Sequence, residues 1–264
     1  MFKYQNFFTT KNIITNKGIL KYRCKTIKSG DMLECEIYPI WNRSYLRRAK
    51  LKTSREEQKA LNDKNRRKKI VRLVNTNFTE KDMWLTVTYD KEHNPQDLDE
   101  AQKNIRNYMR KIKRRDKYVK YLYVTEGKKN SKRFHHHVFI STKLSRDEIE
   151  NLWQYGARKE AHRLQPDEFY LTGIAIYTTK AIKNKNQWGY SKNLKQPKIT
   201  TADTKLTKRQ AQKITEDENA AISLFEKLFN GYQNLKTEWF SSNIINGVYI
   251  TTVMRKIKST RKKR

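Results

Sequence analysis

The sequence predicts an α+β fold in which an antiparallel sheet carries helices on one face. Two observations lead to this class. Hydrophobic residues make up 36% of the 264 residues, with 15 Tyr, 10 Phe and 5 Trp, which is enough for a sizeable core. Strand-like and helix-like segments then follow one another in the order β-α-β-β-α-β-α over residues 83–185. This is the order of a ferredoxin-like, split βαβ arrangement.

Four segments have the alternation or the apolar content of strands: residues 83–89, 119–126, 134–141 and 169–177. Two helices separate them. Asp97 with Glu100, and Ser145 with Glu148, have the three-residue spacing of helix caps. Apolar positions recur at helical spacing between Leu98 and Ile112. A third helix is predicted to start within residues 178–185.

The flanking regions also contain predictable elements. Residues 18–40 resemble a hairpin that turns at Lys28–Asp31, and a basic helix is expected from Ser54 to about Val74. Near the C-terminus, a helix is predicted to start at Thr215 and end at Gly231, followed by a strand over residues 247–254.

The expected organisation has four parts. Residues 1–75 form a hairpin and basic helix packed on the core, 76–200 the central domain, and 201–254 a helix and strand extension. Residues 255–264 contain seven Lys or Arg and no acid, and are predicted to be a disordered basic tail.

Charge indicates a polyanionic partner. The chain has 59 Lys and Arg against 27 Asp and Glu, a formal net charge of +32. Nucleic acid is the partner that such a charge favours, with an anionic membrane surface or a merely basic, solvated surface as alternatives. The candidate DNA-binding side chains are Arg66, Arg67, Lys68, Lys69 and Arg133.

Tyr118, Tyr121 and Tyr123 are candidate stacking surfaces for single strands, or equally sheet-packing residues. Cys24 and Cys35 are predicted to lie on the two arms of the hairpin, as reduced thiols or at most one bridge. The sequence has neither a membrane-spanning apolar run nor the apolar core of a signal peptide, so we expect a cytoplasmic protein with no membrane partner.

Three consecutive histidines lie inside a predicted strand. Because side chains alternate, His135 and His137 should project from one face and His136 from the other. Glu126 ends the preceding strand and can approach them across the hairpin. Two imidazoles and a carboxylate suit Mg²⁺ or Mn²⁺ acting on a phosphate. The alternatives are three hydrogen-bonded or solvent-facing histidines, and a Glu126 paired with a lysine.

Tyr177 is the candidate nucleophile. It lies at the predicted exit of a strand, and Lys180 follows three residues later, on the same face of a helix. A nearby cation favours phenolate over phenol and can hold a phosphate. The alternative is a core tyrosine with a solvated lysine.

The series of Trp84 to Asp90 (WLTVTYD), Glu126 with FHHHVFIS (134–141), and Tyr177-Thr-Thr-Lys180 resembles the three ordered motifs of HUH endonucleases. It is most similar to phage and plasmid rolling-circle replication initiators with one catalytic tyrosine. The resemblance implies an HUH nicking domain over residues 76–200. It also implies nicking and joining of single-stranded DNA at a replication origin, with a host helicase or polymerase as further partners.

The resemblance also implies residue roles. His135 and His137 would bind the metal with Glu126, Tyr177 would form a 5′-phosphotyrosine, and Lys180 would assist. Thr86, Thr88 and Asp90 are structural candidates, and His136 is an alternative ligand. Other functions remain open: a single-tyrosine HUH transposase or relaxase, or a non-enzymatic nucleic-acid-binding protein.

Overall fold

A computed structural model describes residues 18–41, 54–127, 133–156, 159–180, 182, 185–241 and 247–257. The chain forms two compact units. One is continuous, Arg55–Gln196, and the other combines the chain before residue 55 with the chain from Pro197 onward. Each unit has its own antiparallel sheet, which confirms an α+β protein.

The sheet of the Arg55–Gln196 unit has the strand order β6-β3-β5-β4-β7, with every pair antiparallel. The strands are β3 (Met83–Thr88), β4 (Lys120–Glu126), β5 (His135–Ser141), β6 (Lys159–Arg163) and β7 (Trp188–Tyr190). With the helices α3 (Leu98–Arg115), α4 (Arg146–Asn151) and α5 (Thr172–Thr179), the expected order β-α-β-β-α-β-α is present.

The predicted caps form in two of these helices. The Asp97 side chain accepts from the backbone N of Glu100 at the start of α3. Ser145 and Glu148 make both hydrogen bonds of a capping box at the start of α4. On α3, the predicted apolar face is buried: Ala101, Ile105, Met109 and Ile112 all lie in the core.

The prediction that residues 169–177 form the fourth strand was wrong. That strand is β6, whereas most of the apolar run forms helix α5. A short apolar run fits a buried strand and a buried helix equally well. β6 escaped detection because its sequence, KEAHR, is polar, as is common for a strand at a sheet edge.

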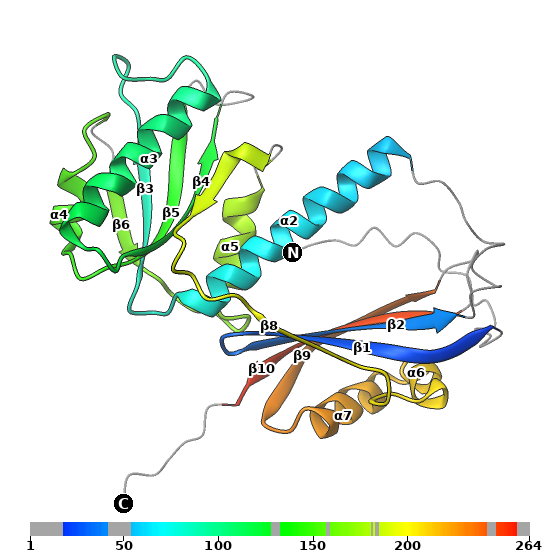
Figure 1. Cartoon of the computed structure of the whole chain (residues 1–264). Helices are drawn as coiled ribbons and strands as arrows, with labels where there is room; N and C mark the ends of the chain where they lie inside the picture. Colours follow the sequence, from blue (N-terminus) through cyan, green and yellow to red (C-terminus); the bar gives the residue numbers. More distant parts are fainter. Residues whose placement is uncertain are drawn as a thin grey trace, which may run out of the picture. The chain divides into compact units, whose positions relative to one another are not determined.

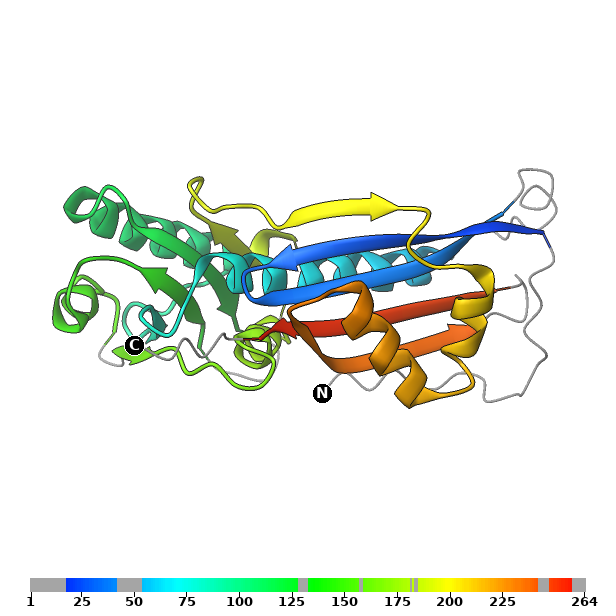
Figure 2. The ribbon, with the colours of Figure 1, turned by 90° about the horizontal axis from the view of Figure 1, so that it is seen from below.

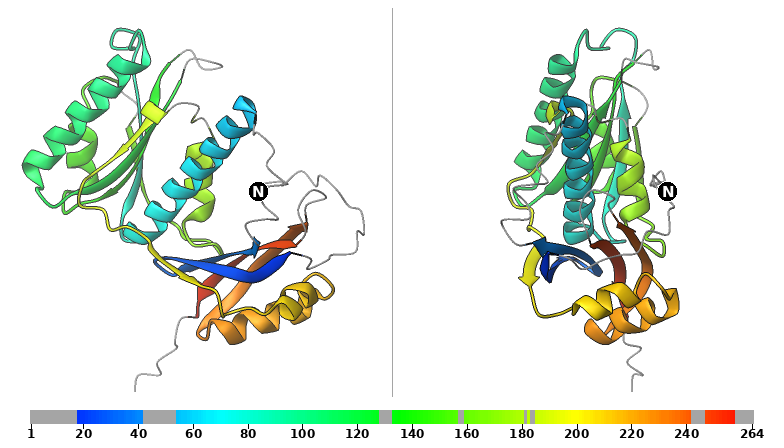
Figure 3. Two further views of the ribbon diagram at one scale, coloured as in Figure 1. Left: turned by 45° about the vertical axis from the view of Figure 1, so that its right-hand side comes forward. Right: turned by 90° about the vertical axis from the view of Figure 1, so that its right-hand side faces the viewer.

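Helices cover both faces of this sheet, where one covered face was expected. In Figures 1 and 3, α3 and α4 lie on one side and α2 (Arg55–Asn77) with α5 on the other. The second layer is held by polar and aromatic contacts: Asn75 donates to Thr172 Oγ1 at 2.9 Å, and Phe78 contacts Phe139. The basic helix therefore continues three residues beyond Val74.

The second unit contains a sheet of order β8-β1-β2-β10-β9. The strands are β1 (Ile19–Ser29), β2 (Met32–Trp41), β8 (Lys198–Ala202), β9 (Tyr232–Ser241) and β10 (Val248–Lys256). Figure 2 shows α6 (Lys208–Lys213) and α7 (Glu218–Leu228) over one face of it. The predicted hairpin turn is present, and Cys24 and Cys35 are buried free thiols in the core.

The units divide the chain differently from the expected boundaries. Residue 75 falls inside α2, and the N-terminal hairpin pairs with β8 and β10 from the end of the chain. In the last third, α7 is capped by Asp217, two residues after the expected Thr215.

The predicted disordered tail is wrong for its first two residues. Arg255 and Lys256 belong to β10, and the next backbone N–H, that of Ile257, donates to Gly231 O. The remainder of the predicted tail, residues 258–264, lies outside the described residues. None of the described helices is both long enough and apolar enough to cross a membrane.

Candidate metal and tyrosine site

Three side chains converge at the end of the β4–β5 hairpin. Glu126 is paired with His135 in the ladder, and His137 lies two residues further along the same face. Glu126 Oε2 lies 3.2 Å from His135 Nε2 and 3.7 Å from His137 Nε2. All three ligand atoms are within 4.8 Å of one another. The structure thus brings together the three residues that the sequence indicated.

Electrostatics prepare this cluster for a cation. Hydrogen bonds from His135 and then His137 hold the pKa of the Glu126 carboxyl well below its usual range, so the group is charged at neutral pH. Thr86 Oγ1 lies 3.1 Å from His137 Nδ1. A hydrogen bond to one ring nitrogen orients the ring and directs the other, here Nε2, at the metal position.

The donor set fits a small divalent ion. Two donors bound at right angles to an ion about 2.1 Å away lie about 3 Å apart, which is close to the two distances from Glu126. His137 is almost fully buried while Glu126 is 41% exposed, so one side of the cluster is open to water and substrate. A Glu–His–His group of this kind can hold a metal ion.

His136 lies on the opposite face, as strand alternation predicts. Its ring is fully buried, with Nε2 2.8 Å from Tyr89 Oη and Nδ1 2.9 Å from Thr125 Oγ1. Burial lowers the pKa of this imidazole to about 3. His136 is therefore a neutral core residue whose two nitrogens already have partners, not a third histidine of the cluster.

Tyr177 lies over the same sheet face as the two cluster histidines. Its ring centroid is 6.1 Å from that of His137 and 6.4 Å from that of Trp84. The side chain is 55% exposed, and the Nζ of Lys180 lies 5.5 Å from its ring centroid. The sequence placed Tyr177 at a strand exit, but it lies in helix α5, with Lys180 as the C-terminal cap.

Sequence reasoning missed the role of Trp84. Its ring stacks on His137 with centroids 5.0 Å apart and an angle of 9°, and it meets Tyr177 edge-on. Trp84 therefore contacts both a cluster histidine and the tyrosine. The β3–β5 register pairs Trp84 with Phe139 and Thr86 with His137, which only a known strand pairing reveals.

The other two structural candidates lie outside the cluster. The backbone oxygen of Thr88 accepts a hydrogen bond from Trp153 Nε1 at 2.8 Å. The Asp90 carboxylate contacts His93 Nδ1 at 2.8 Å, and hydrogen bonds from His93 lower its pKa.

The four α2 candidates for DNA binding lie in the more exposed part of that helix. Lys69 is exposed, and Arg66 pairs with Asp63 at 2.8 Å. Arg67 and Lys68 are half-buried. Arg133 is exposed just before β5.

The three candidate stacking tyrosines do not share a surface. Tyr123 is buried on the α3 face of the sheet, and Tyr121 packs against the same core. Tyr118 is 73% exposed and lies before β4, away from either position. The sheet-packing alternative therefore applies to Tyr121 and Tyr123.

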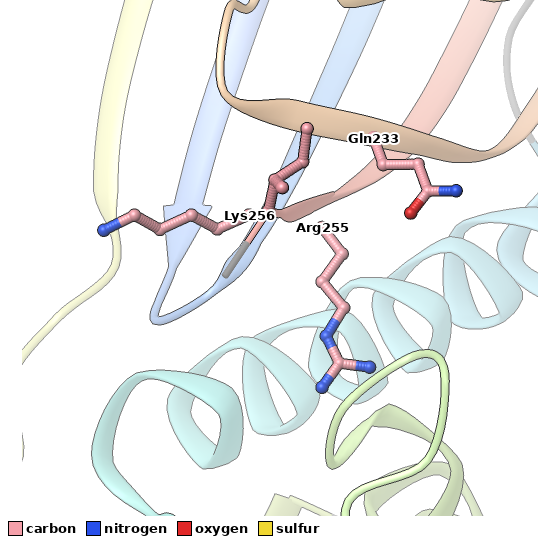
Figure 4. A pocket seen from close by; sticks show the side chains of 4 residues that line it. Gln233, Arg255 and Lys256 are labelled. Atoms are coloured by element: carbon pink, nitrogen blue, oxygen red, sulfur yellow. The ribbon is translucent and has the colours of Figure 1, made fainter. Parts of the chain in front are cut away.

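A pocket of about 350 Å³ occurs in the other unit, at the end of β10. Gln233, Arg255, Lys256 and Ile257 line it (Figure 4). These side chains include no carboxylate, imidazole or thiol, so the pocket offers none of the ligands found in the Glu126 cluster.

The matched range of one family model coincides with this site. Residues 82–186 match the model for the replication-associated protein ORF2 family. The match includes the Glu126 cluster, Tyr177 and Lys180, and excludes α2, β7 and the whole of the other unit. This similarity supports a role in DNA replication and is consistent with a rolling-circle replication initiator. Searches of curated proteins and of solved structures found no match.

Proposed function

We propose that this protein is a rolling-circle replication initiator, an HUH-type endonuclease and strand transferase that nicks and joins single-stranded DNA at an origin. The observation that carries the proposal is the position of Tyr177, whose ring lies 6.1 Å from that of His137 in a three-residue metal cluster. The similarity over residues 82–186 supports the same role. Host helicase or polymerase would then act on the nicked origin.

The proposed residues divide the work of a transesterification. Glu126, His135 and His137 hold the metal, and Trp84 holds the tyrosine beside it. A bound Mg²⁺ or Mn²⁺ would supply Lewis-acid polarisation of a phosphate oxygen. The Lys180 ammonium, 5.5 Å from the Tyr177 ring, neutralises charge on the same phosphate.

The bond changes balance without an external energy source. The Tyr177 hydroxyl loses its proton to solvent, and its oxygen attacks phosphorus. The P–O3′ bond breaks, the 3′ oxygen takes up a proton, and the 5′ phosphate remains on Tyr177. The new ester preserves the energy of the broken one, so attack by a 3′-hydroxyl reverses the step and joins two ends.

Tyr177→Phe is the direct test. We expect it to abolish both cleavage and the covalent adduct, because the phenylalanine ring keeps the packing but lacks the attacking oxygen. The wild type is incubated with Mn²⁺ and a pool of 3′-labelled single strands, and the adduct is detected as a shift on a denaturing gel. EDTA should prevent it.

Tyr118→Phe is the matched control, because Tyr118 is also exposed and also has a lysine, Lys117, 4.9 Å from its ring. This variant should form the adduct at the wild-type level. An adduct that persists in Tyr177→Phe would show that Tyr177 is not the nucleophile. No adduct in the wild type under any metal would favour a non-enzymatic nucleic-acid-binding protein.

A further inference from the structure

The edge strand β7 carries two aromatic side chains on the face that holds the metal cluster. Val124 pairs with both His137 and Trp188, and Leu122 pairs with both Phe139 and Tyr190. Side chains of directly paired residues project from the same face. Trp188 therefore lies in the same row as His137, about 10 Å away by two strand spacings.

These two aromatic rings form a flat surface with a cation above it. The Trp188 and Tyr190 centroids are 5.4 Å apart with an angle of 19°, and Tyr190 is 37% exposed. The Nζ of Lys69 on α2 lies 5.7 Å from the Trp188 centroid and 5.6 Å from the Tyr190 centroid. We call Trp188, Tyr190 and Lys69 the β7 platform.

The backbone of β7 is specialised for its position. A Cβ atom on Gly189 would lie 2.5 Å from the Tyr123 hydroxyl oxygen and 2.6 Å from its Cζ. The glycine lets β7 pair closely with β4 over a buried tyrosine on the other face. This pairing fixes Trp188 and Tyr190, which flank Gly189, on the face that α2 and α5 cover.

The charge around the platform matches a phosphate chain. On α2, Arg66 and Arg72 flank Lys69 at i−3 and i+3 and so share its side of the helix. Aromatic faces beside a basic helix are the two components of sequence-tolerant single-strand binding: bases stack on the rings and phosphates contact the cations.

We propose that the β7 platform is a stacking subsite for a base of the single-stranded DNA, with Lys69 contacting the adjoining phosphate. This subsite rests on the proposed function and deepens it. Its three residues lie outside the range 82–186 that matches the family model. It also assigns base stacking to residues other than the tyrosines that the sequence indicated.

The test compares a single strand with and without bases. Binding of the full chain, in the Tyr177→Phe background to prevent cleavage, is measured by fluorescence anisotropy. The probes are a labelled 20-nucleotide thymidine strand and an abasic strand of the same length, which keeps the phosphates. We expect Tyr190→Ala and Trp188→Ala to weaken binding of the thymidine strand about fivefold or more each, the contribution of one stacked base. Binding of the abasic strand should be unchanged.

Lys69→Gln should weaken binding of both strands, because a phosphate contact is independent of the base. Tyr190→Phe and Trp188→Phe should restore the preference for the thymidine strand, since both keep a π face. Tyr118→Ala, which removes a tyrosine with its own neighbouring lysine, is the matched control and should bind both strands as the parent does.

Two results would overturn the subsite. One is an equal loss of thymidine-strand and abasic-strand binding in Tyr190→Ala with unchanged thermal stability. The other is an equal loss for duplex DNA, which offers no free base. Because the readout is binding, it separates from the proposed function. A wild type that forms no adduct but loses base-dependent binding in Tyr190→Ala would sink the nickase and retain the subsite.

Discussion

His135, His136 and His137 are three identical side chains whose environments differ because strand side chains alternate. Two of them approach Glu126 within 3.7 Å, whereas the third is buried between Tyr89 and Thr125. The alternation was predictable from the sequence. The identity of the partners was not, because Tyr89 and Thr86 are brought in by strand pairing and packing.

The histidines should therefore respond differently to truncation. His135→Ala and His137→Ala should each lose most Mn²⁺ binding and metal-dependent cleavage, since a site that loses one of three protein ligands binds weakly. His136→Ala should instead destabilise the fold by about 2–4 kcal/mol, because it leaves a cavity and two unpaired hydroxyls. Isothermal titration with Mn²⁺ and urea unfolding distinguish the two effects. Equal loss of Mn²⁺ affinity in all three would contradict the assignment.

Thr86 offers a subtler test at the same scale. Its Oγ1 is the hydrogen-bond partner of His137 Nδ1, at 3.1 Å. Thr86→Val keeps the shape and removes that bond, and the loss of such an outer partner typically lowers metal affinity about 10- to 100-fold. We expect a weaker Mn²⁺ affinity in titration calorimetry. Thr88→Val is the control, because Thr88 meets its partner Trp153 through its backbone oxygen. An unchanged affinity in Thr86→Val would remove Thr86 from the site.

At the scale of elements, local signals predicted the well-capped helices and the buried strands, and failed where tertiary structure decides. The apolar run before Tyr177 becomes helix α5, while the polar segment KEAHR becomes the edge strand β6. Helix α5 is positioned by Tyr170, which has a left-handed φ of 58° and donates from its hydroxyl to Phe78 O. A left-handed tyrosine is unusual, so no sequence pattern indicated this turn.

This turn should link stability to cleavage. Tyr170→Phe removes one buried hydrogen bond and leaves Phe78 O without that donor, which should cost about 1–3 kcal/mol in the free energy of unfolding. Because the turn leads directly into α5, we also expect slower adduct formation with unchanged Mn²⁺ affinity. Urea unfolding and single-turnover adduct formation measure the two effects. A variant of wild-type stability would show that the hydroxyl contributes nothing to this turn.

At the scale of the whole molecule, the sequence could not reveal that the two ends of the chain share one sheet. β1 pairs with β8, and β2 with β10, across most of the chain length. Such pairings depend on contacts far apart in sequence, and each strand alone carries no sign of its partner. The proposed catalytic residues, Glu126, His135, His137 and Tyr177, all lie in the continuous unit Arg55–Gln196.

The concentration of positive charge beyond β10 provides the last prediction. The end of the folded strand fixes where a deletion can start, because Ile257 N donates to Gly231 O. Removing residues 258–264 deletes five cations: Lys258, Arg261, Lys262, Lys263 and Arg264. Each phosphate that the shortened protein no longer neutralises lowers the log–log slope of duplex affinity against salt by about 0.9.

If three of these cations bind phosphates, the slope should flatten by about two to three units, with weaker binding at low salt. Sequence preference should be unchanged, because phosphate contacts carry no base information. Cleavage of a saturating short oligonucleotide should persist, since the catalytic residues lie in the other unit. Anisotropy titrations at several salt concentrations measure the slope. Replacing the same five residues with glutamine is the matched control for charge rather than length, and it should flatten the slope equally. An unchanged slope in both variants would show that these cations do not bind DNA.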